Sequence, residues 1–215
     1  MNLKRKVMEA AGLILVALPA YAQVVNHSQQ VSPTRRDERV VSFIHQANLF
    51  EIEAAKLAQA QSSSQDVKEF AGQMISDHQS ADELVRSYAQ SKGIDLDTLR
   101  TQLMEANDQR LEDERRSKTL GSATGEWAFT WENANVAKDE DSKTLVRLRK
   151  LQGAAFDREY ASTMVKGHQH VVDRLADVRD HGLDPALRDL IDQLLPTVRH
   201  HLEMAKALKG AVAKA

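Results

Sequence analysis

The sequence contains no cysteine, and this absence excludes several classes of protein at once. No disulfide can join its segments, no zinc–thiolate site can form, and no thiol can act as a nucleophile. A lipoprotein anchor also needs a cysteine at its cleavage site, so we expect a soluble mature protein. Its stability must come from packed secondary structure.

Proline and glycine are also scarce, with four and nine residues among 215. Apolar residues nowhere alternate with polar ones for long enough to predict a sheet. The 29 basic and 31 acidic residues form no basic stripe, which argues against a nucleic-acid partner. Gly-x-Ser-x-Gly and glycine-rich phosphate loops are missing, so we expect no enzymatic activity.

Residues 1–22 have the pattern of a secretion signal. Three basic residues at 4–6 precede the apolar run Ala10–Leu18, and Ala20-Tyr21-Ala22 is a small-x-small cleavage site. The run is about half the roughly 20 residues that a membrane-spanning helix needs. We therefore predict cleavage after Ala22, no transmembrane segment in the mature form, and a periplasmic or secreted location. Polar residues 23–36 are expected to be a flexible linker.

Apolar residues then recur with helical spacing in four segments, which predict an all-α domain over residues 37–212. The first helix ends near Gln61, and the second runs from the serine cluster 62–64 to a stop at Gly93. The third is expected from Asp141 to His181. The fourth opens with Asp184-Pro185 and contains Pro196, which should kink it. Because each helix is apolar on one side only, we predict an antiparallel four-helix bundle that is monomeric.

Residues of about 95–140 form a long connection between the second and third helices. Its first half is charged and predicts extra helix, whereas its second half contains Gly121, Gly125, Trp127 and Trp131. The two tryptophans are expected either to dock on the bundle or to bind a protein partner.

Several motifs make the chain similar to a known family. They are Phe43-x₆-Phe50-Glu51-Ile52-Glu53, Val67-Lys68-x-Phe70-Ala71-x₂-Met74-Ile75-x-Asp77-His78, Gly153-Ala154-Ala155-Phe156-Asp157-Arg158-x-Tyr160 and Leu195-Pro196-x₃-His200-His201-Leu202. The chain resembles the DUF4142 family of secreted bacterial proteins. This resemblance implies a ferritin-like four-helix bundle and an extracytoplasmic location, and it implies no particular activity. The tryptophan-bearing stretch departs from the family, whose members cross between these helices by a shorter connection.

Polar residues interrupt the apolar stripe of every predicted helix at positions that face the core. They are Glu51, His78, Asp157, His168 and His201. Inward carboxylates and imidazoles could bind a transition metal such as iron, zinc, copper or manganese. The incomplete motif favours instead a buried carboxylate–imidazole network that fixes helix register, and solvent exposure is the third alternative. The paired Glu-x-x-His motifs of di-iron proteins are missing, and Asp157 and His168 are about 16 Å apart along one helix. His27, His45 and His181 lie off the stripes and are expected to be solvated.

Two functions follow from these observations. The first is a non-enzymatic helical-bundle protein of the periplasm, acting in envelope stress or partner binding, with no certain cofactor. The alternative is a metal-binding protein, a vestigial relative of di-iron proteins, that uses the inward-facing Glu, Asp and His residues.

Overall fold

The computed structural model describes residues 32–99 and 143–214, and the predicted signal, the linker before residue 32 and most of the 95–140 connection lie outside these ranges. The described residues contain helices and no strand, which confirms the all-α prediction. The four long helices are α1 (Arg35–Gln61), α2 (Gln65–Ser91), α5 (Gly153–Arg179) and α6 (Pro185–Val212). None of the described helices is long and apolar enough to cross a membrane.

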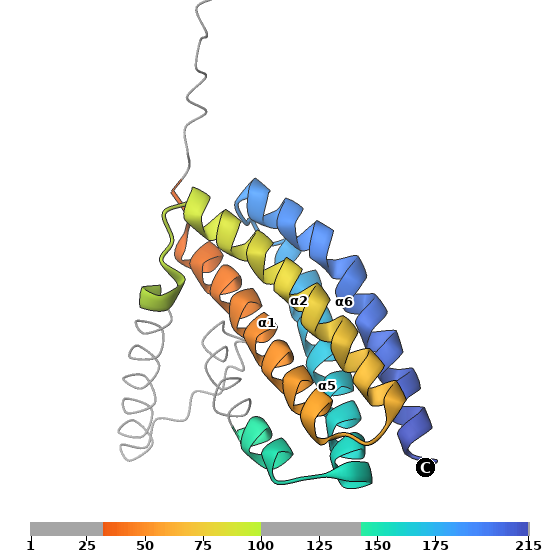
Figure 1. Cartoon of the computed structure of the whole chain (residues 1–215). Helices are drawn as coiled ribbons and strands as arrows, with labels where there is room; N and C mark the ends of the chain where they lie inside the picture. Colours follow the sequence, from red (N-terminus) through yellow and green to blue (C-terminus); the bar gives the residue numbers. More distant parts are fainter. Residues whose placement is uncertain (1–31, 100–142, 215) are drawn as a thin grey trace, which may run out of the picture. The chain divides into compact units, whose positions relative to one another are not determined.

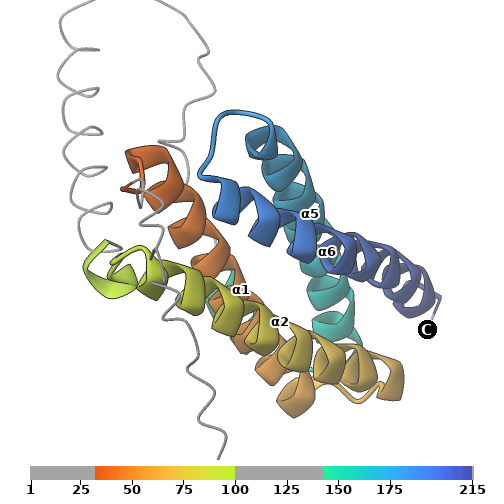
Figure 2. The ribbon, with the colours of Figure 1, turned by 90° about the horizontal axis from the view of Figure 1, so that it is seen from above.

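The helices pair as two antiparallel hairpins, α1 with α2 and α5 with α6 (Figure 1). The hairpins meet through contacts of α2 with α6 and of α1 with α5, so that each helix has two neighbours. Figure 2 shows the four helices from above, arranged as a bundle. Four helices with one-sided apolar stripes bury all of these stripes in such an arrangement.

Local signals place the helix ends where the sequence predicts them. Gly93 has a φ of 68° and follows α2, where the N–H groups of Gly93 and Ile94 donate to carbonyls of the last turn. This is the Schellman arrangement, which favours glycine because other residues are strained at positive φ. At the start of the last helix, Asp184 accepts hydrogen bonds from Ala186 N and Leu187 N and so caps α6.

The third helix is shorter than predicted, because the chain breaks between two helical segments. Residues 143–149 are helical, Lys150–Gln152 leave the helix, and α5 begins at Gly153, which has a φ of 54°. The prediction of one helix from Asp141 to His181 was therefore wrong. Its periodic pattern spans the break because Leu148, in the first segment, is buried in the same core as Phe156.

The core consists of two apolar clusters, one toward each end of the bundle. One cluster contains Ile44, Val85, Leu175 and Leu195 among others. The other is built around Met74, Phe156, Met164, Ala54 and Ala205. On every helix the two clusters are separated by a short stretch that carries a buried polar side chain. A polar layer therefore crosses the middle of the bundle.

Asp184 joins three helices, and its loss should destabilise the bundle. Besides capping α6, its Oδ2 lies 2.7 Å from Lys92 Nζ at the end of α2, and its N–H donates to Asp37 Oδ1 in α1. We expect Asp184→Ala to lower the free energy of unfolding by about 2–3 kcal/mol, because both the cap and a largely buried ion pair are lost. Asp184→Asn keeps the cap and should recover about 1 kcal/mol of this. Urea unfolding of both variants measures the effect, and a loss below about 0.5 kcal/mol for the alanine variant would contradict it.

Candidate metal centre

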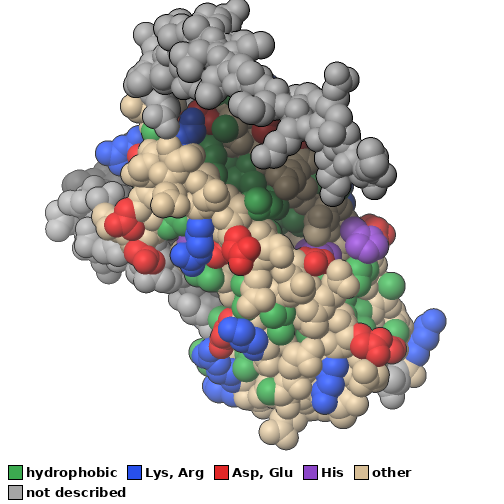
Figure 3. Space-filling model, turned by 45° about the horizontal axis from the view of Figure 1, so that its top comes forward, with side chains coloured by type: hydrophobic (Ala, Val, Ile, Leu, Met, Phe, Trp, Pro, Cys, Tyr) green, Lys and Arg blue, Asp and Glu red, His purple; other side chains and the backbone are tan. Residues whose placement is uncertain are grey.

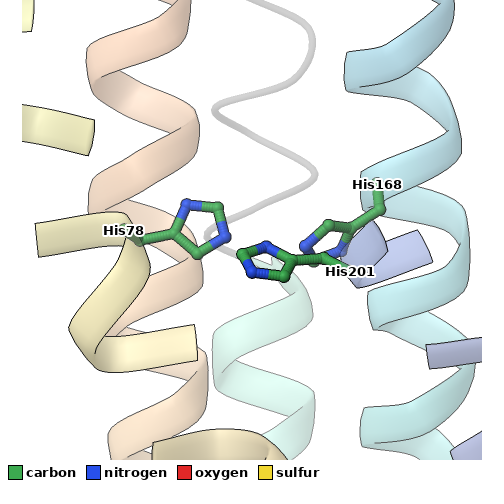
Figure 4. A group of neighbouring side chains, drawn as sticks. All are labelled: His78, His168 and His201. Carbon is green, nitrogen blue, oxygen red and sulfur yellow. The ribbon is translucent and has the colours of Figure 1, made fainter. Parts of the chain in front are cut away.

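Three histidines from three helices form the centre of the polar layer. His78 comes from α2, His168 from α5 and His201 from α6, and Figure 4 shows their rings turned toward one another. The ring centroids form a nearly regular triangle, with separations of 5.3, 5.5 and 5.6 Å. One nitrogen from each ring can be chosen so that all three lie within 4.8 Å of one another. The side chains are almost completely buried.

Each imidazole is held by a hydrogen bond through one of its nitrogens. His78 Nδ1 lies 3.0 Å from Asn48 Oδ1, His168 Nδ1 lies 2.8 Å from the Met164 carbonyl oxygen, and His201 Nε2 lies 2.8 Å from Asp77 Oδ2. All three partners are acceptors, so each of these nitrogens carries the proton. The opposite nitrogens, His78 Nε2, His168 Nε2 and His201 Nδ1, are buried without a hydrogen-bond partner. The arrangement fixes three tautomers and leaves three lone pairs inside the bundle.

Burial keeps the three rings neutral. Desolvation, together with the neighbouring His168 and His201, lowers the pKa of His78 to about 3. Burial also lowers the pKa of His168 and of His201, although the bond to Asp77 opposes this at His201. Neutral imidazole is the form that binds metals.

Glu51 of α1 lies beside the histidines. Its Oε1 is 3.6 Å from His168 Nδ1, and its Oε2 is buried without a partner. Burial raises the pKa of Glu51 to about 8, so the carboxyl group is protonated at neutral pH. Space for it depends on Gly167, because a Cβ at that position would approach Glu51 Oε1 to 3.0 Å.

Four of the five residues that the sequence singles out thus meet at one level of the bundle, and one does not. Asp157 is buried on α5, three turns from His168, and borders the apolar cluster around Phe156 and Tyr160. It is absent from the histidine group and from the cavity beside it.

Sequence reasoning missed the residues that orient the rings. Asn48 lies four residues after Ile44 and three before Glu51, a spacing that places it on the inward face of α1. Asp77 diverges from His78 on α2, and for that reason it reaches across to His201 on the neighbouring helix. Hydrogen bonds from Gln73 and His201 outweigh the effect of partial burial and lower the pKa of Asp77, so His201 donates to a carboxylate.

His45 differs from the expectation that it is solvated. Its side chain is buried, and Nδ1 lies 2.6 Å from Asp82 Oδ1, while Oδ2 of the same carboxylate accepts from Arg86. The N-terminal half of α1 is buried over a wider arc than its apolar stripe predicts, since residues 40–45 are all buried. His181, by contrast, is exposed as expected, and His27 lies outside the described residues.

Comparisons with known proteins address the fold and the family. A crystal structure of a DUF305 fragment from Deinococcus radiodurans is similar, with a TM-score of 0.60 and 14% identity over 85% of this chain and 99% of that one. At this identity the likeness shows the fold alone. No curated protein matches the chain. The family described as "Domain of unknown function (DUF4142)" matches residues 22–208, and the chain therefore belongs to the DUF4142 family.

Proposed function

We propose that this protein binds one transition-metal ion through His78, His168 and His201. The observation that carries the proposal is the set of three buried ring nitrogens without hydrogen-bond partners. Each belongs to a ring whose other nitrogen is anchored, as metal-binding histidines are anchored by outer hydrogen bonds. The pair of Asp77 and His201 repeats the carboxylate–histidine arrangement found behind many metal ions.

A purely structural network explains these residues less well. Such a network stabilises a core when its members satisfy one another, and an unsatisfied buried polar atom costs about 1–3 kcal/mol. Here three ring nitrogens are buried without a partner, and one nitrogen from each ring lies within 4.8 Å of the others. A metal ion accepts all three lone pairs at once.

The ligand set favours a borderline divalent ion such as zinc, copper, nickel or cobalt over magnesium or calcium, which prefer oxygen. Zn–N bonds of about 2.0–2.1 Å place tetrahedral ligands roughly 3.3 Å apart, so small rotations of the rings would close the group on an ion. Glu51 lies beside His168 but is not among the atoms that lie within 4.8 Å of one another. One three-histidine group suits one ion, in contrast to the two-ion sites of di-iron proteins.

The place of action proposed here is the periplasm or the exterior of the cell. The pattern of residues 1–22 supports export, with cleavage after Ala22. A role in envelope stress, a monomeric state and a protein partner at Trp127 and Trp131 stay predictions, and both tryptophans lie outside the described residues.

Metal titration of the mature, untagged protein tests the proposal. We expect visible absorption to report one Co²⁺ per chain, displaced by Zn²⁺, with Cu²⁺ binding most tightly in accord with the Irving–Williams order. His78→Ala and His201→Ala should each weaken binding at least about a hundredfold, more than loss of an outer-shell partner does. His170→Ala is the matched control, since His170 is exposed on α5 outside the group. Less than about 0.1 metal per chain after reloading would refute a metal site of useful affinity.

A further inference from the structure

A cavity of about 520 Å³ lies directly against the three histidines. All four helices line it, with Ile44 from α1, Ala81 and Leu84 from α2, Leu175 from α5, and Leu194 and Val198 from α6. Its mouth lies between α2 and α6, where exposed Ser80, Gln193 and Thr197 border it. Figure 3 shows hydrophobic side chains gathered in a hollow of the surface, with histidine near its margin. A small molecule entering this cavity reaches the imidazole nitrogens.

The charges around the cavity are unbalanced once a divalent ion is bound, and this inference rests on the metal site proposed above. Three neutral imidazoles leave the ion its full double charge, and the Asp77 carboxylate, which accepts from His201 and Gln73 at the rim, offsets one unit of it. The other acid at the cavity is Glu51, which carries its proton and lies outside the group of three histidines. A buried charge requires a counter-charge. The cavity therefore presents one residual positive charge at its base.

The walls specify the rest of the ligand. Among the described residues that line the cavity there is no Lys or Arg, and the side chains above the histidines are almost entirely aliphatic. Buried polar groups on a ligand body would find no partners there, whereas methylene groups would be desolvated favourably. The polar lining residues lie at the mouth and at the histidines, so polarity is placed at the two ends of the cavity.

We propose that the cavity binds a medium-chain aliphatic monocarboxylate. Its carboxylate would complete the coordination of the metal ion, and its alkyl chain would lie along Ile44, Leu84, Leu175 and Leu194 toward the mouth between α2 and α6. The head group is selected by charge and the tail by apolar surface. A carboxylate without a tail satisfies only the first requirement, and an alcohol of the same length satisfies only the second.

The test uses the full mature protein loaded with Co²⁺, whose visible spectrum reports changes of coordination. Acetate, hexanoate, octanoate and decanoate are titrated, with 1-octanol as the uncharged control. Each buried methylene should tighten binding by about fourfold until the cavity is filled, so octanoate should bind at least about a hundredfold more tightly than acetate. Octanoate should bind at least about tenfold more weakly to the metal-free protein, as measured by calorimetry.

Two cavity-filling variants from facing helices, Ala81→Phe and Val198→Phe, should weaken octanoate binding at least about tenfold while acetate and Co²⁺ binding stay unchanged. Ala60→Phe, at an exposed position of α1, is the control. If one cavity variant does not fold by circular dichroism, the other decides. Equal affinities for acetate and octanoate, or equal binding of octanoate and 1-octanol, would overturn the ligand proposal and leave the metal site standing. Failure to take up Co²⁺ would overturn both.

Discussion

Replacing Glu51 with glutamine should remove most of the decline in stability that the metal-free protein shows as the pH rises from 5 to 8. Burial raises the pKa of Glu51 from 4.5 to about 8, and the helices that surround the side chain leave its Oε2 without a partner. The folded protein therefore keeps the carboxyl proton over a range in which the unfolded chain has lost it. Unfolding releases this proton.

The direction of the effect follows from proton linkage. Below pH 4.5 both states carry the proton, and the contribution of the protonated Glu51 is complete. As the pH rises toward 8, stability falls by up to about 1.4 kcal/mol per pH unit, or by about 3.5 kcal/mol between pH 5 and 8. His78 acts in the opposite sense, because its pKa is lowered from 6.5 to about 3, so its contribution rises with pH and is complete near 6.5. The decline caused by Glu51 is therefore clearest above pH 6.5.

Urea unfolding in the presence of a chelator, at several pH values, measures this difference. The variant Glu51→Gln should have a free energy of unfolding that is nearly constant above pH 6.5. The matched control is Glu53→Gln, because Glu53 lies on the same helix but is half-exposed and pairs with Arg149 on the surface. Wild-type and Glu51→Gln profiles that run parallel within about 1 kcal/mol would show that the carboxyl group is solvated in the native protein.

The helices could be predicted from the sequence because their signals are local. Gly93 and the pair Asp184-Pro185 end and start helices through contacts within a few residues of themselves. The break before Gly153 was missed because the residues on both sides pack into one core, so that hydrophobic periodicity continues through it. Burial of His45 was missed for a related reason, since the width of the buried arc on a helix depends on its neighbours rather than on its own pattern.

The site could be predicted only in part. The sequence shows which face of a helix is buried, and this was enough to nominate Glu51, His78, His168 and His201. It does not show how far one helix is shifted along another. That shift brings the three histidines to one level and leaves Asp157, three turns away on α5, outside the group. The Glu-x-x-His motif of di-iron proteins could not locate this group, because no glutamate precedes any of the three histidines by three residues. An oxygen acceptor lies behind each ring instead.

Replacing His168 with leucine should abolish metal binding and make the metal-free protein more stable. His168 Nε2 is buried without a partner. Its Nδ1 donates to the Met164 carbonyl, which also accepts the backbone N–H of His168 within the α-helix and so keeps a partner when the ring is removed. Leucine therefore removes an unsatisfied nitrogen and strands no other group. We expect the free energy of unfolding to rise by about 1–2 kcal/mol, while Co²⁺ affinity falls at least about a hundredfold.

The sign of the stability change separates a binding site from a structural network. If His168 served only to hold the helices in register, its loss would destabilise the protein by about 1–3 kcal/mol. His78→Leu should gain less than His168→Leu, because it leaves Asn48 Oδ1 buried without a donor. Met164→Leu, one turn away in the same core, controls for repacking and should stay within about 1.5 kcal/mol of the wild type. Unfolding by urea without and with Zn²⁺ measures the free energy of unfolding of the metal-free protein and its increase on metal binding. An increase that is present in the wild type and missing in His168→Leu would show that these imidazoles destabilise the metal-free protein and serve to bind the ion.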